Sequence, residues 1–190
     1  MNLRHPLILA SNSPRRHQLL TDAGFAFEVY TTPVDEDYPS SLPTGDIATY
    51  LSEKKNKVYH EDQPDCLILT ADTTVILDDR LLEKPADLVE ANEMLEKLSG
   101  RTHEVVTGVT IGINGSTSSF HSTTKVHFRE LSAWEIQFYV EEFKPLDKAG
   151  AYGIQEWIGQ VGITSIEGSY FNVVGLPIDT VYQALLKYSQ

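Results

Sequence analysis

Two adjacent arginines, Arg15 and Arg16, follow an apolar run, a polar loop and a proline in the stretch LILASNSPRRHQLL. Ser13 and Pro14 are typical of the first positions of a helix. Free N–H groups make a helix N-terminus favourable for negative charge, so arginines there are locally unfavourable unless an anion binds. Guanidinium and free N–H groups bind phosphate oxygens together. The pattern indicates an anion site, although it is not a Walker A loop; the alternative is two solvated arginines.

A second candidate is Asp72, which interrupts the apolar run LILTADTTVIL. A carboxylate on a strand that is covered on both faces is costly unless it is paired, hydrogen-bonded or bound to metal. Asp72 lies either inside such a strand or at its carboxyl end, where it would cap the next turn, and the spacing leaves both open. In open α/β sheets ligands gather at the carboxyl ends of strands, where Ser11 and Asp72 would both lie.

A third candidate is the acidic loop TPVDEDYP, in which Asp35, Glu36 and Asp37 are adjacent. Such clusters are usually solvated surface. Magnesium, however, typically takes one or two carboxylates together with substrate phosphates. Glu36 with Asp72 would be enough for such a site.

Lysines provide the remaining positive charge near these segments. Lys54, Lys55 and Lys57 occupy neighbouring positions of a predicted helix, so they cannot all face one site. Lys84 directly precedes Pro85, which stiffens its turn. Surface solvation is the alternative for each of them.

Other catalytic arrangements are not supported. The six histidines form no HExxH motif and no close pair at helical spacing, and His103 is expected to pack or cap rather than to catalyse. Ser11 and Ser13 do not lie in a G-x-S-x-G elbow. Cys66 is the only cysteine, so neither a disulfide framework nor a zinc site can be built, and its apolar surroundings predict a buried residue.

Strands and helices are predicted to alternate through the first half of the chain. A short buried strand is expected over 7–10, and the helix that begins after Ser13 is expected to end at Gly24. Apolar residues on one face predict a helix over 47–58. The nearly continuous β-branched run over 66–77 predicts a strand covered on both sides.

In the second half, Asp87 and Glu90 are spaced as the capping box of a helix that ends before Gly100. Strands are then predicted over 103–113 and 124–128, separated by a polar turn. Later elements are a helix from Ser132 to Phe143 with its own capping box, an ordered loop over 148–162, a last strand over 169–175, and a helix from Pro177 to near Lys187. This order predicts a mixed α/β fold.

The chain has 190 residues, 41% of them hydrophobic, which suits a single domain over 1–190 without a separable linker. Its net charge of −12 opposes binding to nucleic acid and to anionic membranes. The first apolar run is too short for a signal peptide, and no run approaches ~18 apolar residues. The sequence therefore predicts a cytoplasmic protein.

Six segments, taken in order, resemble the Maf family of nucleoside triphosphate pyrophosphatases. They are LASNSPRRHQLL, VDE, ADTTVILDDRLLEKP, LSGRTHEVVTGV, DKAGAYGIQ and GSYFNVVGLP. The resemblance extends over nearly the whole chain. It implies a mixed, twisted central sheet with flanking helices, in two lobes around a cleft as in inosine triphosphatase, and a homodimer that requires Mg²⁺ or Mn²⁺. The segments EKP, THEVVTG and GIQ resemble the branch that hydrolyses dTTP and UTP.

The resemblance also implies roles for individual residues. Catalytic roles fall on Asp72, Glu36, Lys55 and Lys84; metal binding falls on Glu36 and Asp72; substrate binding falls on Ser11, Arg15, Arg16, Thr73 and Gln155. Asp72 would be the general base or a metal ligand. Arg15, Lys55 and Lys84 would hold the departing pyrophosphate, and Arg16 would bind substrate or support the loop. Two positions depart from the family pattern, because Thr70 and Glu156 stand where glycine is common.

The implied reaction is hydrolysis of a pyrimidine nucleoside triphosphate, or a modified one, to the monophosphate and pyrophosphate, which would clean nucleotide pools. The alternative is a nucleotide-binding regulator of cell division or septum formation without catalysis. A buried carboxylate beside the phosphates speaks against pure binding, because it repels the ligand unless a metal intervenes. A phosphatase that releases orthophosphate would use the same residues.

Overall fold

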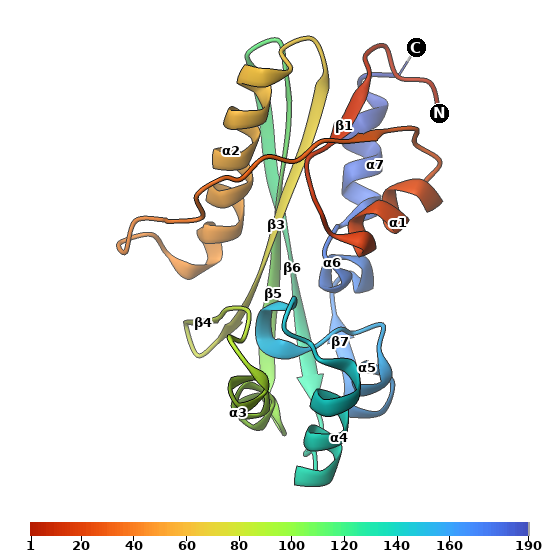
Figure 1. The fold of residues 1–190 in the computed structure, drawn as a ribbon. Coiled ribbons are helices and arrows are strands. Elements are labelled where there is room, and N and C mark those ends of the chain that lie inside the picture. The colour runs from red at the N-terminus through yellow and green to blue at the C-terminus, as the bar shows by residue number, and fades with distance from the viewer. Residues whose placement is uncertain (190) are drawn as a thin grey trace. The chain divides into compact units, whose positions relative to one another are not determined.

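The computed structural model describes residues 1–189, in which strands and helices alternate along much of the chain (Figure 1). The strands are β1 (Leu7–Leu9), β2 (Glu28–Val29), β3 (Leu67–Leu77), β4 (Arg80–Leu82), β5 (Thr102–Ile113), β6 (Ser116–Phe128) and β7 (Ile163–Glu167). The helices are α1 (Pro14–Asp22), α2 (Thr44–Asp62), α3 (Leu88–Leu98), α4 (Ala133–Phe143), α5 (Trp157–Gly162), α6 (Tyr170–Val174) and α7 (Ile178–Leu186), with a 3-10 turn, η1 (Ala149–Ala151). Within 1–189, no helix combines the length and apolar character needed to span a bilayer.

The strands form a mixed sheet with the hydrogen-bonded order β2-β1-β3-β5-β6-β7, and β4 pairs with β3. Strand β1 is parallel to both β2 and β3, whereas β4 and β7 are antiparallel to their partners. Helices connect many of the strands, as parallel pairing requires. The predicted mixed α/β class is confirmed.

The chain divides into two compact units, each made from separate stretches of sequence. Unit 1 comprises Met1–Asp72, Thr107–Ser122 and Gly175–Gln190, and unit 2 comprises Thr73–Val106 and Thr123–Val174. Three of the four boundaries fall inside β3, β5 and β6. The change of unit therefore leaves no linker-like signal in the sequence.

In unit 1, the strands β1 and β3 are covered on both faces. Leu9 and Leu69 belong to a core cluster with Leu185 of α7, whereas Ile8 and Ile68 belong to a second cluster with Tyr59 of α2. Burying one such aliphatic side chain contributes about 1.5–3 kcal/mol. Coverage on both faces explains why these strands are continuously apolar.

Buried polar side chains bind α2 to β3 and β5 inside unit 1. Ser52, Asn56, Thr70 and Thr110 are fully buried. Ser52 Oγ lies 2.8 Å from Thr110 Oγ1, and Thr70 Oγ1 donates to the carbonyl of Ser52 at 2.8 Å. Asn56 Nδ2 donates to the carbonyls of Ile68 and Thr110 at 2.9 and 3.2 Å. These bonds fix the rotation of α2, which carries Lys55, relative to the strands.

In unit 2, the carboxyl-terminal part of β3 packs against α3 and α4. Val75 shares a cluster with Leu95 of α3 and Tyr139 of α4. His103 is buried there with 2% exposure, and its Nε2 lies 2.7 Å from the hydroxyl of Tyr152. As the sequence predicts, His103 packs in the core.

Helix ends agree with the signals in the sequence. Ser132 and Glu135 form a reciprocal capping box at α4, and Asp87 accepts from the N–H of Glu90 at α3. Gly24 has a φ of 82°, which permits the chain reversal after α1. Ser13 occupies the N-cap of α1, but its side chain makes no capping bond.

The predicted turn over 114–119 is shorter in the structure. Asn114 and Gly115 alone make the reversal, with φ angles of 49° and 75°, and β6 already begins at Ser116. Positive φ at both central residues is typical of the two-residue hairpin turn. The polar character of the residues after Gly115 predicts a turn, whereas they belong to a strand whose side chains are largely exposed or half-buried over that part.

The strand predicted over 169–175 is wrong, because α6 forms there. Tyr, Phe and Val favour strands locally. Asn172, however, is buried, and its amide donates to the carbonyl of Val105 at 3.0 Å and to Thr124 Oγ1 at 2.9 Å. The last strand is β7 instead, and the ordered loop predicted over 148–162 contains η1 and α5.

Candidate active site

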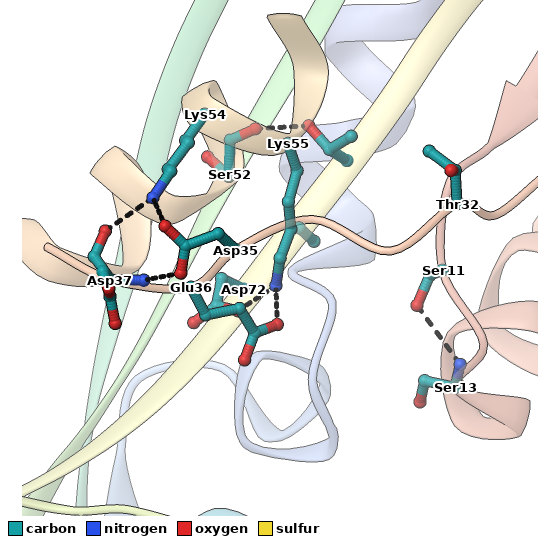
Figure 2. Close-up of polar contacts among 12 residues, drawn as sticks. Ser11, Ser13, Thr32, Asp35, Glu36, Asp37, Ser52, Lys54, Lys55 and Asp72 are labelled. Carbon is teal, nitrogen blue, oxygen red and sulfur yellow. Dashed lines mark hydrogen bonds and ion pairs between the residues drawn. The ribbon is translucent and has the colours of Figure 1, made fainter. Parts of the chain in front are cut away.

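Lys55 links two carboxylates at the centre of the candidate site in unit 1. Its Nζ lies 2.6 Å from Oδ1 of Asp72 and 2.7 Å from Oε1 of Glu36 (Figure 2). The side chains of Lys55 and Asp72 are each 15% exposed, whereas that of Glu36 is 55% exposed. Helix α2, strand β3 and the 35–37 loop thus each contribute one charged group.

Burial lowers the pKa of Lys55, but the adjacent carboxylates of Asp72 and Glu36 more than offset that effect, so its pKa lies above the ordinary value. Lys55 therefore remains an ammonium ion around neutral pH. One partly buried cation balances part of the negative charge of two carboxylates.

Asp72 lies inside β3, which resolves the two alternatives left by the sequence. Five buried residues precede it in the strand, and four follow Thr73. The pairing of β1 with β3 ends where Leu9 lies opposite Leu69, and the N–H of Ala10 donates to the carbonyl of Leu69. Asp72 is therefore a mid-strand residue that lies past the end of the shorter neighbouring strand, where a polar side chain is accessible.

The loop after β1 is held by Arg16. Its Nε donates to the carbonyl of Gly175 at 2.8 Å, and its Nη1 donates to the carbonyl of Ala71 at 2.9 Å and to Ser11 Oγ at 3.3 Å. Ser11 Oγ also accepts from the N–H of Ser13 at 3.2 Å, as Figure 2 shows. Burial lowers the pKa of Arg16, partly offset by the carboxylate of Asp72. These contacts favour a role for Arg16 in shaping the loop.

The other acidic residues of the 35–37 loop face a different lysine. Lys54 Nζ lies 3.0 Å from Oδ2 of Asp35 and 2.8 Å from the carbonyl of Asp37 (Figure 2). The N–H of Asp37 and the ammonium of Lys54 lower the pKa of the Asp35 carboxyl. Of the three acidic residues, Glu36 is the one that contacts Lys55.

Glu36 and Asp72 are the carboxylates of this site that could hold a divalent cation. Both contact the ammonium of Lys55, which places the two carboxylates close together. Over residues 1–189, no group of three or more His, Cys, Asp and Glu side chains is arranged to hold a metal. Two carboxylates without further protein ligands fit Mg²⁺, which usually retains water and takes substrate phosphates.

Arg15 is half-buried in the first turn of α1, in unit 1, and the remaining predicted residues belong to unit 2. Thr73 is half-buried in β3 directly after Asp72, and Lys84 is exposed after β4 beside the buried Pro85. Gln155 is half-buried before α5 and contributes to a pocket of about 360 Å³ that Gln160, Ser165 and Tyr170 also line.

Sequence reasoning missed a polar cluster in unit 2, formed by Tyr139, Lys148 and Glu156, which we call the Tyr139 cluster. Tyr139 is fully buried, and its hydroxyl donates to Oε2 of Glu156. Lys148 Nζ lies 3.1 Å from Oε1 of Glu156 and 2.7 Å from Oδ1 of Asp147. Lys148 and Glu156 lie on either side of the GIQ motif in the sequence. This proximity was the only sequence feature that pointed to the cluster.

Comparisons with known proteins show which fold and which family this chain resembles. The fold is that of a mixed α/β protein similar to the Staphylococcus aureus Ham1 protein, with a TM-score of 0.58, 14% identity, and coverage of 96% of this chain and 98% of that chain. The chain belongs to the Maf family, because the model described as Maf-like protein matches residues 6–188.

Two proteins with similar sequences are named dTTP/UTP pyrophosphatase. The protein from Phocaeicola vulgatus is 48% identical over 186 residues, which cover 97% of this chain and 96% of the relative. The protein from Cytophaga hutchinsonii is 49% identical over 181 residues, which cover 95% and 83%.

Proposed function

We propose that this protein hydrolyses dTTP and UTP, or modified pyrimidine triphosphates, to the monophosphate and pyrophosphate, and so cleans nucleotide pools. Membership of the Maf family and two nearly full-length relatives named dTTP/UTP pyrophosphatase support this activity. The observation that carries the proposal is the ammonium of Lys55 between Asp72 and Glu36, in a chain whose net charge is −12. Lys55, Asp72 and Glu36 together carry one net negative charge, so holding a triphosphate also needs the proposed cation and Arg15.

In the proposed reaction, a water oxygen forms a bond to the α-phosphorus, and the bond from that phosphorus to the bridging oxygen of the β-phosphate breaks. The electron pair leaves with pyrophosphate, and the proton of the water passes to Asp72. One oxygen of Asp72 contacts Lys55, so the second oxygen of the carboxylate is the proposed proton acceptor. A partly buried base that is held in place can keep the attacking water in line with the α-phosphorus, as the reaction requires.

We propose that Lys55, Arg15 and Lys84 stabilise the charge that develops on the departing pyrophosphate. Lys55 remains protonated beside its carboxylates, which supports this role. Arg16 and Ser11 share a hydrogen bond and are proposed to shape the loop that binds the phosphates.

Thr73 and Gln155 are proposed to recognise the sugar and the base. The amide of Gln155 has both a donor and an acceptor, which suits the polar edge of uracil or thymine.

We propose Mg²⁺ or Mn²⁺ as the cofactor, held by Glu36 and Asp72. The convergence of these two carboxylates on one ammonium supports the site. When bound, the cation supplies charge neutralisation to the phosphates. A carboxylate oxygen that holds a cation is a poor proton acceptor, so the proposed base is the oxygen of Asp72 that does not hold the cation.

The first experiment identifies the products from dTTP and UTP in the presence of Mg²⁺, in the wild type and in Asp72→Asn. We expect pyrophosphate and monophosphate from the wild type, and turnover lower by about 10²–10⁴-fold in Asp72→Asn, because a general base is lost. Asp79→Asn is the matched control, because Asp79 is an exposed carboxylate in the turn that follows β3.

Three other outcomes contradict parts of the proposal. Release of orthophosphate indicates a phosphatase. Binding of nucleotides without turnover by the wild type indicates the regulator. Full activity in Asp72→Asn removes Asp72 from the chemistry.

We also propose a homodimer that acts in the cytoplasm, where its nucleotide substrates are found. Membership of the Maf family supports the dimer, and the proposed nucleotide substrates support the location. Light scattering on the purified protein should give twice the mass of one chain, and the mass of one chain would overturn the dimer.

A further inference from the structure

The Tyr139 cluster lies beneath a short turn that carries Gln155. The N–H of Glu156 donates to the carbonyl of Gly153 at 3.0 Å, which closes a four-residue turn with Ile154 and Gln155 at its centre. Ile154 is buried with 6% exposure, whereas Gln155 is half-buried. The turn thus buries the side chain of Ile154 and leaves that of Gln155 partly accessible.

The hydroxyl of Tyr139 contacts both ends of this turn. It accepts from the N–H of Gly153 at 3.0 Å and donates to Oε2 of Glu156. Burial, together with the carboxylate of Glu156, raises the pKa of Tyr139, so the hydroxyl keeps its proton. A single buried group therefore fixes the distance between the two ends of the turn.

Lys148 completes the cluster with charge. It is buried with 9% exposure, and its Nζ contacts the other oxygen of Glu156, Oε1, at 3.1 Å. Both oxygens of Glu156 therefore have partners, and rotation of the carboxylate would deprive the buried hydroxyl of Tyr139 of its acceptor. The carboxylate is held in one orientation below Gln155.

Close packing leaves little room for the turn to move. A Cβ at Gly153 would lie 2.7 Å from Nε2 of Gln155, and a Cβ at Gly159 would lie 1.9 Å from the carbonyl oxygen of Ile154. Glycine at both positions lets the backbone of α5 and the amide of Gln155 lie against the turn. Because interiors are closely packed, a change below the turn is transmitted to Gln155.

We propose that Tyr139, Lys148 and Glu156 are positioning residues that hold the 153–156 turn and thereby set how strictly Gln155 selects the base of the nucleotide. The inference rests on the proposed function of Gln155 in base recognition. Uracil has a carbonyl group where cytosine has an amino group. The donor and the acceptor of the Gln155 amide therefore discriminate between these bases only when the orientation of the amide is fixed.

The experiment measures binding of UTP and CTP analogues with a non-hydrolysable α,β-imido link in the wild type, Tyr139→Phe, Glu156→Gln and Lys148→Met. We expect the preference for the UTP analogue over the CTP analogue to fall by about 5- to 20-fold in each variant, the range for a lost directional hydrogen bond. Lys148→Arg retains the ion pair and should restore most of the preference. Glu142→Gln, an exposed carboxylate of α4, is the matched control and should preserve it.

A second measurement tests whether the cluster acts through Gln155. In a Gln155→Ala background, Tyr139→Phe should cause no further loss of preference, because the group it positions is already absent. Equal losses in both backgrounds would overturn the proposal. So would an unchanged preference in folded Tyr139→Phe and Glu156→Gln, or a wild type that binds both analogues equally.

Turnover of dTTP and UTP by the wild type is measured separately. If the variants lose preference in binding but the wild type releases no pyrophosphate, the proposed hydrolysis fails and the positioning role stands. If the wild type hydrolyses UTP and the variants keep its preference, the positioning role fails and the hydrolysis stands.

Discussion

Two adjacent lysines of α2 have the same charge and different partners. Lys55 contacts Asp72 and Glu36, whereas Lys54 contacts Asp35 and the backbone of Asp37. Successive residues of a helix point about 100° apart, so only one of the pair can face β3. The neighbouring lysine is thus a natural control for the one in the candidate site.

We expect Lys55→Met to lower kcat/KM for UTP by about 10²–10³-fold, because a preorganised charge beside the phosphates is lost. Lys54→Met should leave kcat/KM within about 2-fold, because exposed ion pairs contribute little. Steady-state kinetics at saturating Mg²⁺ provides the measurement. Equal losses in the two variants would contradict the assignment of Lys55.

At the scale of elements, the site depends on how closely α2 approaches β5. A Cβ at Gly108 of β5 would lie 2.3 Å from the backbone nitrogen of Thr49, and one at Gly112 would lie 2.2 Å from Oδ1 of Asn56. Only glycine permits this approach without a shift. The same approach allows the buried hydrogen bond between Ser52 and Thr110.

Thr70, which departs from the family pattern, has a role in this contact. Its hydroxyl donates to the carbonyl of Ser52 and accepts from the amide of Asn56 at 3.3 Å. Ser52 and Asn56 lie on either side of Lys55 along α2, and Thr70 lies two residues before Asp72. These hydrogen bonds therefore fix α2 against β3 close to the ion pair of Lys55 with Asp72.

Gly108→Ala should lower the free energy of unfolding by about 1–3 kcal/mol, because the added methyl group overpacks the contact with α2. It should also lower kcat, because α2 must shift and Lys55 shifts with it. Gly45→Ala, in the first turn of α2, is the control, since a Cβ there has nothing within 4 Å. Denaturant unfolding and kinetics on both variants test the expectation, and a Gly108→Ala protein as stable and active as Gly45→Ala would contradict it.

At the scale of the molecule, each unit has its own core, and the stability of unit 2 depends on a buried histidine. Burial, with a smaller effect of His127, lowers the pKa of His103 to about 4. An unfolded chain binds the proton near pH 6.5, whereas the folded chain does not until about pH 4. The stability that neutral His103 contributes is therefore complete above pH 6.5 and is lost as the pH falls towards 4.

We expect unit 2 of the wild type to lose roughly 3 kcal/mol more than that of His103→Gln between pH 7 and pH 4, from the difference between the two pKa values. Glutamine does not titrate and can still bond to Tyr152. Trp134 and Trp157 are the two tryptophans, and both lie in unit 2, so fluorescence reports its unfolding. Parallel pH profiles for the two proteins would contradict the expectation.

Local signals in the sequence were enough for most elements. The capping residues Asp87, Ser132 and Glu135 bond within one helical turn, so short-range chemistry determines where α3 and α4 begin. The apolar run of β3 is a strand because both of its faces are buried. An aspartate inside such a run requires a partner, so the sequence alone indicates Asp72 as a candidate.

Contacts between distant residues decided the rest. Asn172 binds Val105 and Thr124 across 67 and 48 residues, and these bonds help explain a helix where local propensity favours a strand. The Tyr139 cluster likewise joins α4 to a turn that follows it, and no single segment shows it. The sequence by itself determined the class of fold, the helix ends and the charged residues available for chemistry. The family resemblance selected Lys55, but only the tertiary structure showed its contact with Asp72 and what lies beneath Gln155, because burial and pairing depend on segments that are far apart in the chain.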